Sequence, residues 1–283
     1  MKKLSLVFIL LIIILVGTGY VLCHGTTQVL RLSDGQIIAF DGMIKEVSQS
    51  KLIFVGEFHD SKEAHKVQLE IIKKLHQSGV PLAIGMEMFT SKNQAELDRW
   101  VAGKYLMEDF IRFYYSEWNM PWPLYRDILL YARDNQIPLI GLNVPRKISR
   151  KVSKKGFKAL TPAERRLLPA GITCSVNSQY MEFIRGAYME HHTSTDKSFL
   201  YFCEAQMLWN KSMGFHLKDY LGRNPQRLVV VIAGAGHVMK SGIPEEVYQS
   251  TGYGYKVILP DLNWKKITSR DSDYLILFNS LLD

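Results

Sequence analysis

The sequence predicts an α/β fold, a mostly parallel sheet sandwiched by helices. Short apolar runs without polar alternation recur along the chain, as expected for strands that are buried on both faces. Segments whose apolar residues follow a helical period alternate with these runs. A long helical block, at about 146–220, interrupts the alternation. It is too long for an ordinary crossover, so we expect an inserted helical subdomain beside the sheet.

The composition is that of an ordinary globular protein. Of 283 residues, 47% are hydrophobic and 22% are charged, which excludes a disordered chain. There is no internal repeat, and no long linker rich in glycine, serine or proline divides the chain. We therefore expect a single domain over 24–283, preceded by a targeting segment at 1–23.

The strands and helices can be placed in order from their apolar patterns. The first helix shows the pattern well, because Ala64, Val67, Ile71 and Leu75 share one face. Asp60 and Glu63 are spaced for a capping box, as are Thr161 and Glu164 further along, and Gly79 ends the first helix. The expected strands are 51–55, 80–86, 137–142, 227–233, 255–259 and 274–278, and the further helices are 91–100, 108–115, 124–135, 146–155, 162–168, 176–189 and 197–220.

The N-terminus indicates export. Lys2 and Lys3 precede an almost purely apolar run at 4–16, the pattern of a secretory signal. Cys23 is a candidate lipidation site of a bacterial lipoprotein, although Leu22 stands before it where a small residue is usual. A cleaved soluble form and an uncleaved membrane anchor are the alternatives. All three place the domain in the bacterial cell envelope.

Three cysteines do not make a disulfide scaffold. Cys203 lies in an apolar helical stretch, so we expect it to be a small buried hydrophobic residue. A disulfide with Cys174 in an oxidising compartment is the alternative.

The excess of positive charge is local. Lys and Arg number 35 against 27 Asp and Glu, and much of the excess lies at 146–158. A solvated helix face is the simplest interpretation, and contact with anionic lipid headgroups or ligand carboxylates is the alternative. No nucleic-acid motif accompanies the charge, so we expect no nucleic-acid partner.

Polar side chains follow four of the expected strands at the point where each strand ends. In parallel sheets these carboxyl ends meet at one edge, where ligands bind. Two Gly-x-x-His motifs lie there, and their glycines, Gly56 and Gly234, allow a sharp turn and close approach to a ligand. The candidate pocket residues are Glu57, His59, Asp60, Glu87, Asn143 and His237.

Histidines and carboxylates in one pocket suit two kinds of chemistry. They can hold a divalent metal ion, for which Glu57, His59, Glu87 and His237 are the candidate ligands. The same four residues can instead be catalytic and act directly as acid and base. The sequence leaves both open.

Five short motifs resemble those of the ChaN family. They are Gly-Glu-Phe-His-Asp at 56–60, Glu-Met-Phe at 87–89, Gly-Leu-Asn-Val-Pro-Arg at 141–146, Ala-Gln-Met-Leu-Trp at 205–209 and Gly-Ala-Gly-His at 234–237. ChaN proteins are bacterial envelope lipoproteins that are implicated in haem binding and iron uptake. They are similar to Tiki-type metalloproteases and erythromycin-esterase-like hydrolases. The resemblance adds Arg146 to the expected pocket. Asn210 departs from the aspartate usual in this family, and we expect that change to leave the pocket untouched.

The resemblance implies haem as a cofactor, held by a tyrosine phenolate and accompanied by dimerisation. The candidate haem ligands are Tyr180, Tyr188, His191 and His192, all on the helix expected at 176–189 or at its end. The aromatic stretch at 113–125 is expected to pack in the core, and a stacking wall for a flat ligand is the alternative.

Two functional hypotheses follow. The first is a haem-binding envelope protein that takes part in haem or iron uptake, with a homodimer forming on haem loading and a membrane anchor at the N-terminus. The second is a metal-dependent hydrolase, a peptidase or esterase, that uses Glu57, His59, Glu87 and His237.

Overall fold

The computed structural model describes residues 27–176, 178–191, 196–261 and 266–278. The predicted targeting segment, including Cys23, lies outside the described residues, as does His192. Across the described ranges, no helix has the length and apolar character needed to cross a membrane.

The chain alternates strands with helices, as predicted. The strands are β1 (Gln28–Arg31), β2 (Gln36–Ile38), β3 (Leu52–Glu57), β4 (Leu82–Thr90), β5 (Leu139–Asn143), β6 (Leu228–Gly234), β7 (Tyr255–Pro260) and β8 (Tyr274–Leu277). The helices are α1 (Phe40–Val47), α2 (Lys62–Gln77), α3 (Gln94–Val101), α4 (Met107–Glu117), α5 (Trp122–Asp134), α6 (Arg146–Lys155), α7 (Pro162–Arg165), α8 (Ser178–His191), α9 (Asp196–Arg223), α10 (Ala235–Val238) and α11 (Ile243–Thr251), with short 3-10 turns at Ser91–Asn93 and Phe157–Ala159.

The strands form one sheet in the order β2-β1-β8-β7-β3-β6-β4-β5. The six strands from β8 to β5 are parallel, and β1 and β2 add an antiparallel hairpin at one edge. The predicted α/β class with a mostly parallel sheet is therefore confirmed. The hairpin and helices α1 and α11 were not expected from the sequence, because they are short and their apolar patterns are brief.

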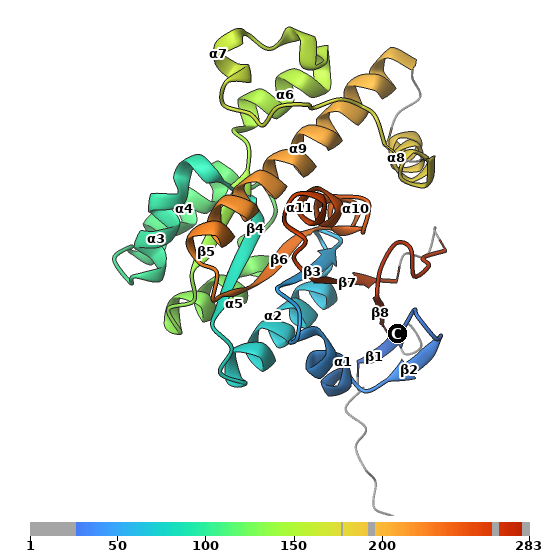
Figure 1. Ribbon diagram of the computed structural model, residues 1–283. Coiled ribbons are helices and arrows are strands. Elements are labelled where there is room, and N and C mark those ends of the chain that lie inside the picture. The colour runs from blue at the N-terminus through green and yellow to red at the C-terminus, as the bar shows by residue number, and fades with distance from the viewer. Residues whose placement is uncertain (1–26, 177, 192–195, 262–265, 279–283) are drawn as a thin grey trace, which may run out of the picture.

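Helices cover both faces of the sheet (Figure 1). Helices α1 to α5 share one core cluster with the sheet, and α10, α11 and the second half of α9 share another. The local caps match the sequence in part. Thr161 and Glu164 form the predicted capping box, whereas Ser61 rather than Asp60 caps α2.

The predicted helical insertion forms a lobe beyond the carboxyl edge of the sheet (Figure 1). Its own core joins α6, α8 and the first half of α9 through residues such as Ile148, Ile184 and Leu208. The second half of α9 packs on the sheet through Met213 and Leu217. The 28-residue helix α9 thus ties the lobe to the sheet and covers the edge where ligands bind.

A disulfide joins Cys174 to Cys203 within this lobe, with a Cα–Cα distance of 5.6 Å. Cys203 is fully buried, as expected, but it is not a free hydrophobic residue. The expectation was wrong because the segment before α8 folds back over α9, a proximity that 29 residues of separation do not reveal.

Candidate functional site

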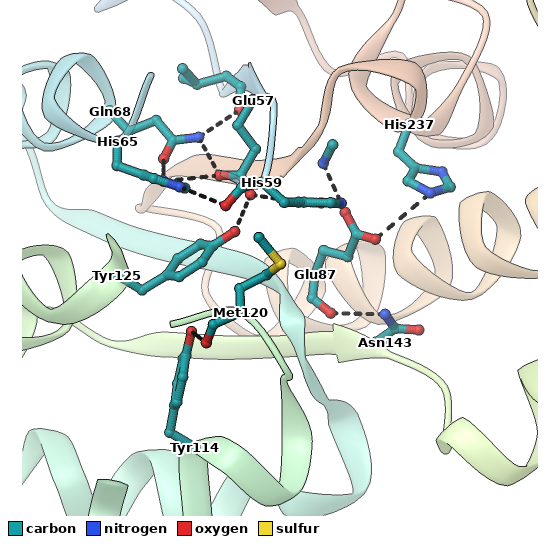
Figure 2. A network of polar contacts seen from close by, with 12 residues as sticks. Glu57, His59, His65, Gln68, Glu87, Tyr114, Met120, Tyr125, Asn143 and His237 are labelled. Carbon is teal, nitrogen blue, oxygen red and sulfur yellow. Dashed lines mark hydrogen bonds and ion pairs between the residues drawn. The ribbon is translucent and has the colours of Figure 1, made fainter. Parts of the chain in front are cut away.

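Three adjacent strands at the centre of the sheet carry the predicted pocket. β6 lies between β3 and β4, so the two Gly-x-x-His motifs and Glu87 meet at one edge. Glu57 stands beside Gly234 in the parallel register, and the Gly234 amide donates a 2.8 Å hydrogen bond to Glu87 Oε2. Figure 2 shows these side chains converging. The predicted convergence is present.

Glu57 is a fully buried carboxylate with a complete set of donors. Its Oε1 accepts hydrogen bonds from the Tyr125 hydroxyl and from His59 Nδ1, the latter at 2.8 Å. Its Oε2 accepts one from Gln68 Nε2 at 2.8 Å, and His65 Nδ1 lies 3.4 Å away. Burial next to this carboxylate raises the pKa of the Tyr125 hydroxyl far above its usual range, so Tyr125 acts as a donor. The network fixes the first turn after β3.

His59 is held as a cation. Burial by itself lowers the pKa of the imidazole, but the hydrogen bond to Glu57 and the negative charges of Glu87, Glu57 and Asp60 together raise it to about 9. At neutral pH the ring is therefore protonated. Its side chain is 36% exposed, and the Trp118 ring lies edge-on at 5.1 Å. A protonated imidazole can donate a proton.

His237, in contrast, is neutral. Burial lowers its pKa, with the His59 charge acting in the same direction and Glu87 against it, so the ring is neutral. Its Nδ1 lies 2.7 Å from Asn210 Oδ1. Its Nε2 lies 3.7 Å from Glu87 Oε1.

A chain of hydrogen bonds sets the tautomer of His237. The Tyr180 hydroxyl donates to the Gly236 carbonyl at 3.0 Å, so it must accept from Asn210 Nδ2 at 2.8 Å. The amide oxygen of Asn210 therefore faces His237, and Nδ1 carries the proton that it accepts. The lone pair is left on Nε2. The expectation that Asn210 leaves the pocket untouched was wrong, because α9 brings its side chain against His237.

The two motif glycines lie where a Cβ atom would be crowded. A Cβ on Gly56 would lie 2.6 Å from a Leu259 methyl group and 3.1 Å from the Ala235 backbone, which places α10 directly on β3. A Cβ on Gly234 would lie 3.2 Å from the His59 ring. Close packing, rather than a positive φ, requires these glycines.

Two cavities adjoin at the histidines, since His59, Gln206 and His237 line both. The apolar cavity, of about 470 Å³, is lined by Phe58, Met120, Phe183, Ile184, Ala187 and Phe202 besides the motif residues. The charged cavity, of about 430 Å³, is lined by Glu87, Glu117, Trp118, Arg146, Arg150 and Trp209, among others. Both volumes are in the usual range for small-molecule sites.

A third cavity, of about 760 Å³, is larger but lies elsewhere, between β2, α1 and α2. It holds the Asp41–Lys74 ion pair and no histidine. The convergent polar groups distinguish the two adjoining cavities as the candidate site.

The remaining predicted pocket residues have supporting positions. Asn143 donates to the Glu87 carbonyl at 2.8 Å and accepts from the Val144 amide, so it ties the end of β5 to β4. Asp60 is exposed at the rim of the apolar cavity. Arg146, also exposed, lines the charged cavity at the start of α6.

The two candidate tyrosines are inside the lobe. Tyr180 is 1% exposed and Tyr188 is 2% exposed, and their hydroxyls bond to Gly236 and Ser198, respectively. Burial raises the pKa of Tyr180 well above its usual range, with the Asn210 hydrogen bond acting against this. Either hydroxyl must leave its partner before it can bind iron. His191 ends α8, but its side chain lies outside the described part of the chain.

The predicted divalent-metal site is not supported. Within the described ranges, no three side chains of His, Cys, Asp or Glu lie where they could share a metal ion. Glu57 is already engaged, because it accepts hydrogen bonds from three side chains.

The sequence reasoning missed several residues of the site, among them His65, Gln68, Tyr125 and Trp118. His65 and Gln68 lie on the buried face of α2 next to Val67 and Ile71, where polar residues need a partner, and that pattern was readable. Tyr125 and Trp118 belong to the aromatic stretch. Most of it packs in the core, as expected, whereas Trp118 lines the charged cavity.

Comparisons with known proteins identify a family and similar folds. Residues 43–247 match the family model described as haem-binding uptake, Tiki superfamily, ChaN. The structure is similar to that of ChaN of Campylobacter jejuni, described as cofacial haem binding, with a TM-score of 0.74 at 19% identity over 91% of this chain and 98% of that one. It is also similar in fold to a variant of the erythromycin esterase EreC in its open conformation, with a TM-score of 0.50 at 12% identity over 89% and 82% of the two chains.

One curated relative is the plant protein RETICULATA-RELATED 5, chloroplastic, of Arabidopsis thaliana. It is 27% identical over 136 residues, which cover 45% of this chain. The match spans only 18% of the length of that relative.

Proposed function

The chain belongs to the ChaN family of haem-binding uptake proteins in the Tiki superfamily, and from this premise we propose that it binds haem in the apolar cavity. We place it in the bacterial cell envelope, anchored through its N-terminal segment, where it takes part in haem or iron uptake. The family match supports haem as the ligand, and the cavity supports the position.

The apolar cavity is the observation that carries this proposal. Phe58, Phe183 and Phe202 supply aromatic faces and Met120 an adaptable thioether, and these surfaces suit a flat apolar macrocycle. Phe58 is 37% exposed, so one wall of the cavity is open to solvent before any ligand binds. Bound haem would supply ferric iron, which a tyrosine phenolate or an imidazole can hold.

The iron ligand is proposed from Tyr180, Tyr188, His191 and His192. Both tyrosines are hydrogen-bonded inside the lobe, so ligation by either requires α8 to shift. The loaded form is proposed to be a homodimer, because the related ChaN structure is described as binding haem cofacially.

A haemin titration of the exported domain, residues 24–283, tests this proposal. We expect a saturable shift of the Soret band with a phenolate charge-transfer band. Tyr180 and Tyr188 are alternative ligands, so one of the two variants Tyr180→Phe and Tyr188→Phe should abolish the phenolate band. His237→Ala should keep the band. Spectra of free haemin throughout the titration would contradict haem binding.

Acid–base hydrolysis is the second candidate function, and the different protonation states of His59 and His237 favour it. Two titratable groups whose pKa values are pushed apart at one site are typical of an acid and base pair. A water molecule would attack the carbonyl carbon of an ester or amide. The neutral His237 Nε2 would take the proton that this water loses. His59 would give its proton to the leaving group as the carbonyl bond to that group breaks. No metal is needed for this step.

Replacing Asn210 with aspartate tests the acid–base assignment. Activity on p-nitrophenyl acetate should be flat between the two pKa values, falling above about 9 as His59 loses its proton and in acid as His237 gains one. Asn210→Asp places a carboxylate on His237 Nδ1, which raises the pKa of His237 and moves the acidic limb to higher pH. Asn135→Asp, on an exposed turn, is the control and should leave the profile unchanged. An acidic limb that stays in place in Asn210→Asp would exclude His237 as the base.

A further inference from the structure

A serine and a histidine form a hydrogen-bonded pair away from the site described above. Ser91 begins the 3-10 turn after β4, and His216 lies on the second half of α9. Ser91 Oγ lies 2.9 Å from His216 Nε2. Both residues line a cavity of about 330 Å³ beside β5, the strand at the edge of the sheet. The lining of this cavity shares no residue with the apolar cavity or the charged cavity.

The backbone before Ser91 is held firmly. The amide and the hydroxyl of Thr90 both donate 2.8 Å hydrogen bonds to the buried Glu117 carboxylate. β5 lies directly against this point, since a Cβ on Gly141 would lie 2.6 Å from the Thr90 carbonyl oxygen. Ser91 is thus presented from the end of a fixed strand, and functional side chains need such rigid support.

His216 has a fixed position and is neutral. Met213 and Leu217, on the same helix, are fully buried in the core between α9 and the sheet. Burial of the imidazole lowers its pKa, and the negative charge of Asp219 acts in the opposite direction. The ring is therefore neutral at neutral pH, and one of its two nitrogens has a lone pair.

A serine hydroxyl beside a neutral imidazole is the arrangement of a nucleophile and its base. Among the described residues, neither side chain makes another hydrogen bond, so no other acceptor holds the Ser91 hydroxyl. Lys92 lines the same cavity, and no carboxylate in the described ranges lies within 4 Å of its ammonium group. The charge of Lys92 is therefore available to a negative oxygen that forms during a reaction.

We propose that Ser91 and His216 form a nucleophilic dyad that reacts with small carboxylic esters in this cavity. His216 Nε2 takes the hydroxyl proton as Ser91 Oγ bonds to the carbonyl carbon of the ester. The bond from that carbon to the alcohol oxygen then breaks, and His216 gives the proton to the departing alcohol. The product is an acylated Ser91, which water hydrolyses. The cavity restricts the ester to a small one, because about 330 Å³ is at the lower end of the range for ligand sites.

Diisopropyl fluorophosphate, a small reagent for activated serines, tests the dyad directly. Ser91 Oγ would bond to phosphorus as the phosphorus–fluorine bond breaks and fluoride leaves, and His216 would take the hydroxyl proton. Peptide mass spectrometry should find the diisopropylphosphoryl group on Ser91. Ser91→Ala should lack this adduct, and His216→Gln should slow its formation by about 100-fold or more, the usual effect of a general base. Hydrolysis by His59 and His237 forms no serine adduct, so the mapped peptide distinguishes the two sites.

Two variants and one condition are the controls. Ser116→Ala removes an exposed serine from α4, and His76→Gln removes a histidine whose Nδ1 lies 3.0 Å from the Tyr131 hydroxyl. Neither residue lines this cavity, so neither change should alter the rate at Ser91. Wild-type protein unfolded in urea should lose the reaction, a test that does not depend on the folding of any variant. Absence of the adduct on Ser91, or an equal rate in His216→Gln or in unfolded protein, would overturn the dyad.

Discussion

Replacing Glu57 with alanine is expected to lower the free energy of unfolding by about 3–5 kcal/mol. The carboxylate is fully buried and accepts from Tyr125, His59 and Gln68. Its removal leaves two buried donors unsatisfied and takes away the negative charge nearest to His59. Urea denaturation measures the loss. Glu57→Gln keeps the volume but turns one acceptor into a donor, so its loss should be smaller.

Two expected results distinguish the loss of the buried Glu57 carboxylate from the loss of an ordinary surface charge. Glu70→Ala removes an exposed carboxylate from α2, the helix that carries Gln68, and should change the free energy of unfolding by no more than about 0.5 kcal/mol. The pH dependence should also differ. The pKa of His59 is about 9 in the folded protein, above its unfolded value, so its contribution is complete below about 6.5 and is lost as the pH rises through 9. Glu57→Ala should reduce this alkaline loss. Equal effects of the two alanine variants would contradict a structural role for Glu57.

Filling the apolar cavity should weaken haemin binding by about 100-fold or more, equivalent to about 2.7 kcal/mol. Ala187 lines this cavity from α8, opposite the two Gly-x-x-His motifs. An indole at this position occupies the space proposed for the porphyrin ring. Haemin titrations of Ala187→Trp and the wild type measure the difference, and the melting temperature shows whether the variant folds.

Met189→Trp is the matched control for this substitution. Met189 lies two residues further along α8 and is 68% exposed, outside the cavity lining. The Met189→Trp variant introduces the same indole without filling the cavity, so its haemin affinity should remain that of the wild type. Unchanged binding in Ala187→Trp would place haem somewhere other than this cavity.

The fold could be predicted because its signal is local. Each central strand is a continuous apolar run, and α2 shows its buried face in the spacing of Val67, Ile71 and Leu75. The hairpin β1–β2 was missed because its strands have only four and three residues and lie at the sheet edge with mixed burial. Burial of such strands is decided by partners that are distant in the sequence.

The part of the site that lies directly at the ends of strands could be predicted from the sequence. Glu57, Glu87 and His237 follow strands that are neighbours in the sheet, so parallel pairing alone brings them together. Their roles depend on long helices that the sequence does not place. Gln68 and Tyr125 come from α2 and α5, and Asn210 comes from α9, 27 residues before the histidine that it orients.

Sequence reasoning also could not predict that His59 is protonated and His237 is neutral. Both histidines end the same Gly-x-x-His pattern. One ring meets a carboxylate and the other meets an amide in a buried position, and this difference separates their pKa values.

Locating the iron tests the central claim most directly. Crystals of the exported domain grown with haemin, measured at the iron absorption edge, give an anomalous-difference peak at each iron atom. We expect that peak in the apolar cavity between α8 and the carboxyl ends of β3 and β6. A peak on another surface, or no peak from crystals of a protein that is otherwise folded, would contradict haem binding at this site.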